Sequence, residues 1–157
     1  QFAEDVRVPA PFRAQLDDYR GSGYSRGHMA PAGSHKASRA DMDSTFLLSA
    51  NIVPQELSMN GCDWYRLERL QRDLCRAFPE VVVLSGPAFV SAPVAEREQR
   101  LDVKLVGPNG VHVPTHLWKV IAATDPATKK VHLASFLMPN GPIKDERPLA
   151  DYIVSKR

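Results

Sequence analysis

The segment Tyr19–Ala32 reads YRGSGYSRGHMAPA and contains three glycines, two arginines and one histidine within fourteen residues. It shows almost no hydrophobic periodicity, so no long amphipathic element is expected there. Glycine allows a backbone to turn sharply and to approach a ligand closely, and the other residues place cationic and titratable groups beside it. The segment therefore predicts one half of a functional site, although an isolated Arg-Gly-His tripeptide is more often part of an exposed loop.

The length and composition of the chain predict one folded domain. It has 157 residues, 43% of them hydrophobic, which is enough for one sizeable core. The net charge of +2 and the pI near 8.6 are mildly basic, so charge alone does not name a partner. No apolar run approaches the roughly 20 residues that span a bilayer. Two cysteines, Cys62 and Cys75, are too few for a disulfide framework or a zinc cluster.

The clearest pattern in the chain is a helix that begins after Asn60-Gly61 and ends at Pro79. Apolar side chains recur there at close to 3.6-residue spacing. They are Trp64, Leu67, Leu70, Leu74, Cys75 and Phe78. This stripe predicts a helix over residues 61–78, with Trp64 and Cys75 in the core.

Strand patterns dominate the second half of the chain. Strands are predicted over residues 81–84, 101–106, 111–123, 130–138 and around 151–154. The first is a continuous apolar run and is expected to be buried, whereas residues 91–100 predict a loop. Short turns join the last strands, so the sequence predicts an α+β domain with a mostly antiparallel sheet and flanking helices.

Asn60 and Glu68 are polar residues that the predicted core does not explain. Eight residues of helix place them about 80° apart around the axis and about 12 Å along it. On spacing alone, a helix-capping asparagine is favoured, together with a solvent-facing glutamate paired with Arg66 or Arg72.

Four further polar residues are not explained by the predicted core: Arg26, His28, Asn51 and Gln55. Hydrogen bonding within a turn is the plain interpretation of the last two. Together with the helix pair, however, these groups suit phosphoryl transfer. Histidine, with an ordinary pKa of about 6.5, suits a general base, and the developing charge needs arginine or a divalent metal. Because Mg²⁺ keeps most of its waters, one asparagine carbonyl beside a carboxylate is a plausible anchor.

These motifs resemble those of the DNA/RNA non-specific ββα-metal nucleases, the endonuclease G group. The run Ser25–Ala32, SRGHMAPA, is similar to the DRGH signature of that family. The resemblance continues in order from about Phe2 to Ser155, through Asn51–Gln55, Asn60–Glu68, Leu84–Pro87, Val113–Val120 and Met138–Asn140. It implies a ββα-metal (His-Me finger) nuclease fold.

The resemblance also implies roles for individual residues. His28 would be the general base that activates water for attack on phosphorus. Asn60 would be the only direct protein ligand of one hydrated Mg²⁺, for which Mn²⁺ can substitute, and Glu68 would hold and polarise its waters. Arg26 would hold the scissile phosphate, and Asn51 would support the histidine–metal arrangement. DNA and RNA would be cleaved with little sequence specificity to 5′-phosphate and 3′-hydroxyl ends.

Two departures from the family pattern affect these expectations. Ser25 stands where the family motif has aspartate, a variant associated with the EXOG-like branch and its 5′-exonuclease activity. Family members also carry a phosphate-binding arginine upstream of Gln1 and continue past Arg157, so we expect residues 1–157 to be a single nuclease core domain truncated at both ends. A homodimer and a mitochondrial location are implied as well. The alternative is a catalytically impaired nucleic-acid-binding homologue that keeps the fold.

The other polar residues receive structural interpretations. Lys119, like Lys36 and Arg39, is expected to be an ordinary surface charge, although a nuclease would use such cations for the phosphate backbone. His116 lies within a family-like motif but is expected to be structural.

Overall fold

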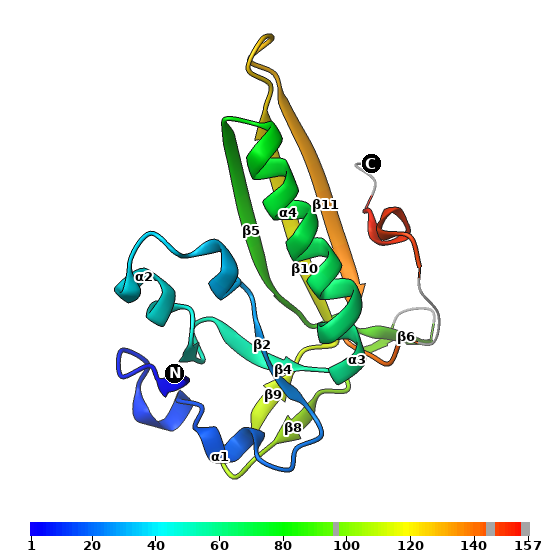
Figure 1. The fold of residues 1–157 in the computed structure, drawn as a ribbon. Coiled ribbons are helices and arrows are strands. Elements are labelled where there is room, and N and C mark those ends of the chain that lie inside the picture. The colour runs from blue at the N-terminus through cyan, green and yellow to red at the C-terminus, as the bar shows by residue number, and fades with distance from the viewer. Residues whose placement is uncertain (96–97, 144–146, 155–157) are drawn as a thin grey trace.

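A three-stranded antiparallel sheet stands above the rest of the molecule and carries one long helix on one face (Figure 1). The computed structural model describes residues 1–95, 98–143 and 147–154. The strands are β5 (Glu80–Ala88), β10 (His116–Thr124) and β11 (Val131–Pro139), in the order β11-β10-β5. The helix is α4 (Tyr65–Ala77). These elements confirm the predicted α+β class, a helix within residues 61–78 and a long strand close to residues 130–138.

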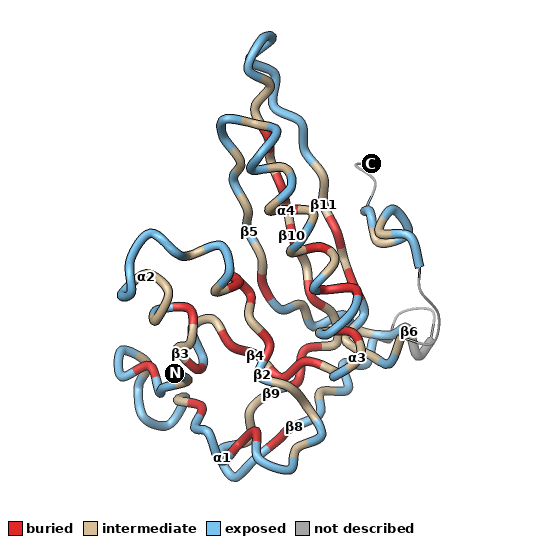
Figure 2. The backbone as a smooth tube through the Cα atoms, viewed as in Figure 1, coloured by how far each residue is buried: buried red, intermediate tan, exposed pale blue. Residues whose placement is uncertain are grey.

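The main core lies between α4 and this sheet. Its buried members are Met29, Met59, Trp64, Leu67, Leu117, Ile121, Phe136 and Met138. Along β10 every second residue is buried, as expected for a strand that packs one face on a helix. Figure 2 shows the buried positions along the inner sides of α4 and the sheet.

The prediction of a fully buried strand at residues 81–84 is wrong. Val82 and Leu84 are 52% and 58% exposed, because only alternate residues of β5 face α4. Cys75 is also exposed rather than in the core, so it lies outside the apolar stripe of α4. The Trp64 prediction is confirmed, since that side chain is buried.

A second sheet contains part of the glycine-rich segment Tyr19–Ala32. Its strands are β1 (Ala3–Glu4), β2 (Ser25–His28), β3 (Leu47–Leu48) and β4 (Ile52–Gln55), in the order β1-β3-β4-β2. Strands β2 and β4 are antiparallel, whereas β3 pairs in parallel with both β1 and β4. The predicted loop Tyr19–Ala32 therefore contains a strand, and His28 is its last residue.

The main helix begins earlier than predicted and is not uniform. Helix α3 (Leu57–Met59) runs into a π-helical turn (Asn60–Trp64) and then into α4. Glu56 caps α3 by accepting a hydrogen bond from the backbone N–H of Met59 at 2.8 Å. Asn60 thus lies inside the helical segment, and its interpretation as a helix cap is wrong. Single π-turns within α-helices often occur at functional sites.

The shorter elements complete the described part of the chain. They are η1 (Ala10–Phe12), α1 (Leu16–Tyr19), η2 (Ala32–Ser34), α2 (Arg39–Ser44), β6 (Ala92–Ala95), β7 (Glu98–Arg100), β8 (Lys104–Val106), β9 (Val111–Val113) and η4 (Leu149–Tyr152). No described helix has the length and apolar character of a membrane span.

Three local predictions need correction. The expected loop over residues 91–100 contains the antiparallel pair β6–β7. The expected strand over 111–123 is split into β9 and β10, with Pro114, which has no N–H, between them. The expected strand near 151–154 is mostly the η4 turn, with one bridge between Ile153 and Phe136.

Gly27 is required by the pairing of β2 with β4. A Cβ atom at this position would overlap the side chain of Gln55, which is fully buried. By contrast, a Cβ at Gly61 in the π-turn would meet no atom within 4 Å.

We predict that Gly27→Ala lowers the free energy of unfolding by about 1–3 kcal/mol, because the added methyl overpacks a closed interface. Urea unfolding measures this change. Gly61→Ala is the matched control and should be neutral or stabilising, since alanine favours helical backbone. Equal stabilities for Gly27→Ala and the unaltered chain would contradict the close packing of β2 on Gln55.

Candidate active site

The backbone that follows β2 is held by side chains from several distant elements. The carbonyl oxygen of His28 accepts a hydrogen bond from the indole Nε1 of Trp64 at 3.0 Å. The next carbonyl, of Met29, accepts from the hydroxyl of Ser85 at 2.7 Å and from Nζ of Lys119 at 3.4 Å. The π-turn, β5 and β10 therefore all position the residue pair that contains His28.

Asn51 completes this arrangement from the turn between β3 and β4. Its side-chain Oδ1 accepts from the Ala30 N–H at 2.9 Å, and its Nδ2 donates to the carbonyls of Ala30 and Thr45 at 2.9 and 2.8 Å. Its backbone carbonyl accepts from the Met29 N–H at 2.9 Å. Asn51 thus contacts the chain just after His28, which goes beyond hydrogen bonding within its own turn.

The His28 imidazole lies among aromatic rings. Its centroid is 4.9 Å from the ring of Phe46, edge-on, and 5.6 Å from the ring of Phe2. Burial lowers the pKa of His28 below its ordinary value. Among the described residues, its buried Nε2 atom has no hydrogen-bond partner.

Arg26 is two residues before His28 on β2, so both side chains project from the same face of the sheet. Its guanidinium carbon lies 4.5 Å from the centroid of the Phe2 ring. Arg26 also lines a hollow of about 640 Å³, together with Ser25, Arg20 and Tyr24. A cation and a titratable imidazole therefore lie on the same face of β2, and the cation borders an open space.

Ser25 connects β2 to Asn60. Its hydroxyl accepts a hydrogen bond from Asn60 Nδ2 at 3.0 Å and donates to the carbonyl of Gln55 at 2.9 Å. Because the amide nitrogen of Asn60 is the donor in this contact, its Oδ1 atom is the one that suits a cation. The structure thus brings the predicted Asn60 next to the strand that carries Arg26 and His28.

Glu68 lies on the first turn of α4 and is not solvent-facing, as its side chain is 14% exposed. A guanidinium nitrogen of Arg72 is 4.0 Å from its carboxylate, which matches the predicted helix pair. Burial raises the pKa of Glu68, while the charges of Lys119 and Arg72 oppose that change.

Lys119 is the residue that the sequence analysis misjudged most. It is fully buried, and its Nζ lies 4.6 Å from the centroid of the Trp64 ring. Burial lowers its pKa to about 8, and the negative charge of Glu68 opposes this shift. The signal was present in the sequence, because Lys119 is two residues from both Leu117 and Ile121 on the same strand. All three side chains therefore lie on the buried face of β10, toward α4. The prediction of a surface charge is wrong.

The available ligands suit one type of cation. In the described part of the chain, no group of three or more His, Cys, Asp and Glu residues could hold a metal ion. An amide oxygen of Asn60 and the carboxylate of Glu68 are hard oxygen donors, and so small a set fits a cation that keeps most of its waters, such as Mg²⁺.

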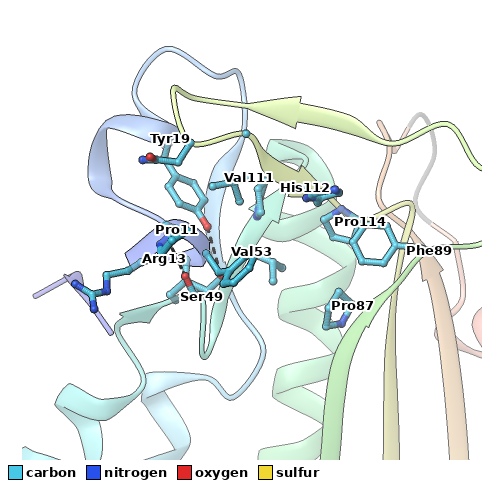
Figure 3. A pocket seen from close by; sticks show the side chains of 16 residues that line it. Pro11, Arg13, Tyr19, Ser49, Val53, Pro87, Phe89, Val111, His112 and Pro114 are labelled. Atoms are coloured by element: carbon cyan, nitrogen blue, oxygen red, sulfur yellow. Dashed lines mark hydrogen bonds between the residues drawn. The ribbon is translucent and has the colours of Figure 1, made fainter. Parts of the chain in front are cut away.

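An apolar cavity of about 510 Å³ is lined in part by β4, the strand that pairs with β2 (Figure 3). Tyr19, Phe89, Val111 and His112 are among its lining residues. His28, Arg26, Asn60 and Glu68 are not among them, so this cavity is separate from the candidate site.

The comparisons with known proteins place this chain in a family. Residues 1–157 match the model of the DNA/RNA non-specific endonuclease family, and the chain belongs to that family. It is 42% identical over 156 residues to the mitochondrial nuclease EXOG of Danio rerio, covering 99% of this chain and 45% of that protein. It is 39% identical over 153 residues to the mitochondrial endonuclease G of Homo sapiens, covering 98% of this chain and 51% of that protein. The chain thus spans about half the length of these curated relatives.

A solved structure extends the similarity to the fold. The chain superposes with a TM-score of 0.91, at 36% identity, on a crystal structure of an EndoG/EndoGI complex that describes EndoG inhibition. The alignment covers 99% of this chain and 63% of that chain. The predicted endonuclease G fold is confirmed.

We predict that Lys119→Met removes a rise of stability with pH. The pKa of Lys119 is about 8 in the folded chain, against 10.5 for an ordinary lysine. Between these values the unfolded chain binds more protons than the folded one, so the free energy of unfolding increases with pH. From pH 7 to 9.5 this contribution is about 2 kcal/mol.

Urea unfolding of both proteins at the two pH values measures the difference. Lys130→Met, at an exposed position, is the control and should keep the full rise. The same rise in Lys119→Met as in the unaltered chain would mean that Lys119 titrates like an exposed lysine.

Proposed function

We propose that this chain is the core of a magnesium-dependent, sugar-nonspecific nuclease that hydrolyses phosphodiester bonds. One observation carries the proposal: Arg26 and His28 project from one face of β2, while Ser25 of the same strand binds the Asn60 amide. A phosphate ligand, a base and a metal ligand are the groups that phosphodiester hydrolysis requires. Family membership and the names of the relatives, which are nucleases, support the same conclusion.

His28 acts as the general base in this proposal. Its imidazole takes a proton from the water that attacks phosphorus, and a pKa lowered by burial keeps the ring neutral at physiological pH. Arg26 binds the non-bridging oxygens of the scissile phosphate and stabilises the charge that develops there. Asn51 fixes the backbone after His28 through its contacts with Ala30, which holds the base in place.

Asn60 and Glu68 hold the metal in this proposal. Asn60 would bind Mg²⁺ through Oδ1, and Glu68 would hold water molecules that the ion keeps. Bound Mg²⁺ supplies positive charge next to the scissile phosphate and polarised water. Mn²⁺, which also prefers oxygen ligands, is expected to substitute.

The substrates we propose are DNA and RNA, bound mainly through phosphate with little sequence specificity. The products carry 5′-phosphate and 3′-hydroxyl ends. A mitochondrial location is inferred because relatives from animals and from Saccharomyces cerevisiae are named mitochondrial nucleases. A homodimer and an EXOG-like 5′-exonuclease mode remain parts of the proposal that rest on the family resemblance.

We predict that His28→Ala lowers kcat for plasmid cleavage in Mg²⁺ by about 10²- to 10⁴-fold, the usual contribution of a general base. Binding of the same plasmid in EDTA should be retained, because the phosphate contacts do not involve the imidazole. His132→Ala, at an exposed position on β11, is the control and should cleave normally.

Two results would count against this proposal. Unchanged cleavage by His28→Ala would remove His28 as the base. Plasmid binding without metal-dependent cleavage by the unaltered chain would instead favour the catalytically impaired nucleic-acid-binding homologue.

We predict that Asn60→Ala raises the Mg²⁺ concentration for half-maximal cleavage at least about tenfold, because an inner ligand is lost. Asn60→Asp keeps an oxygen ligand and should restore most of the response. Urea unfolding without metal checks that both variants fold. A normal Mg²⁺ dependence in Asn60→Ala would rule out Asn60 as the ligand.

A further inference from the structure

Phe2 lies in the middle of the groups that surround the candidate base. Its ring centroid is 5.6 Å from the His28 ring and 5.1 Å from the Phe46 ring, which it meets edge-on. The guanidinium of Arg26 lies over the same Phe2 ring, at 4.5 Å. Phe2 therefore contacts both His28 and Arg26, the two residues of β2 that have proposed chemical roles.

The backbone explains why Phe2 is found there. Strand β1 begins at Ala3 and pairs in parallel with β3. The Ala3 N–H donates to the carbonyl of Phe46 at 3.2 Å. This bond places Phe2 beside Phe46, and both rings contact the imidazole, with interplanar angles of 46° and 89°.

The two contacts of the Phe2 ring differ in nature. Toward His28 the ring supplies apolar bulk, which limits rotation of the imidazole and covers part of its surface. Toward Arg26 it supplies an aromatic face, whose quadrupole attracts a cation. An aliphatic side chain of similar size could replace the first contact but not the second.

We propose that Phe2 is a positioning residue of the nuclease site, which fixes the His28 imidazole by packing and the Arg26 guanidinium by a cation–π contact. This inference rests on the proposed function, because it takes His28 as the base and Arg26 as the phosphate ligand. Phe2 itself touches no reacting atom.

Phe2→Ala tests the packing contact. The groups that face the imidazole are the rings of Phe2 and Phe46, with Arg26 as the nearest charge on its own strand. Burial alone causes the lowered pKa of His28, so removal of the ring should raise that pKa toward its ordinary value. The base must be neutral to act, so the acid limb of kcat/KM should move to higher pH.

A second readout does not depend on catalysis. The His28 proton resonance can be assigned by its loss in His28→Ala and followed against pH by NMR in metal-free protein. In Phe2→Ala its midpoint should move upward. Phe12→Ala, at a side chain that is 78% exposed, is the control and should leave this midpoint unchanged.

Phe2→Leu and Phe2→Tyr separate the two contacts. Leucine keeps apolar bulk but has no aromatic face, so the acid limb should stay near its normal position. The KM for DNA should rise about two- to five-fold, the factor expected for an exposed cation–π contact. Tyrosine keeps the aromatic face and should restore both properties.

The experiments on Phe2 can fail independently of the experiments on the proposed nuclease function. If Phe2→Ala lowers stability but leaves the His28 midpoint, the acid limb and KM unchanged, Phe2 is only structural and the inference is wrong. If His28→Ala cleaves normally, the proposed function fails, whereas the NMR titration still decides whether Phe2 positions the imidazole.

Discussion

Three consecutive backbone carbonyls, of His28, Met29 and Ala30, are the constraint on which the rest of the site depends. Each accepts a hydrogen bond from a side chain that comes from another element: Trp64 for the first, Ser85 and Lys119 for the second, and Asn51 for the third. A buried carbonyl left without a donor costs about 1–3 kcal/mol. Strand β2 can therefore end in only one place relative to the π-turn, β5 and β10, and the position of the imidazole follows from that.

The buried charge of Lys119 links this backbone constraint to the acidic side of the site. The ammonium group bonds the Met29 carbonyl, lies against the Trp64 ring and acts electrostatically on Glu68. An isolated buried lysine would be costly, but here its charge is balanced by a carboxylate that is itself poorly exposed. Lys119 thus interacts both with the backbone next to His28 and with the carboxylate of Glu68.

The sequence was sufficient where one clear pattern determines one element, as for helix α4 and strand β11. Family motifs then singled out His28, Asn51, Asn60 and Glu68, whose roles are part of the proposed function. Contacts between distant segments could not be predicted from the sequence. The packing of Phe2 on His28, for example, depends on a two-residue strand that is too short to show periodicity. Lys119 was misjudged for another reason, because a charged residue was assigned to the surface although its strand register placed it inside.

Ser25 stands where the resemblance leads us to expect aspartate, and a serine at this position has consequences for the electrostatics of the candidate site. A hydroxyl can accept from Asn60 Nδ2 and donate to the Gln55 carbonyl at the same time, as the structure shows. An ionised aspartate has no proton to donate, so it could serve Asn60 but would leave the Gln55 carbonyl without this donor. It would also add a negative charge beside the candidate metal ligand. With serine, Asn60 is oriented without that charge, and Glu68 supplies the anionic charge of the candidate metal-binding pair.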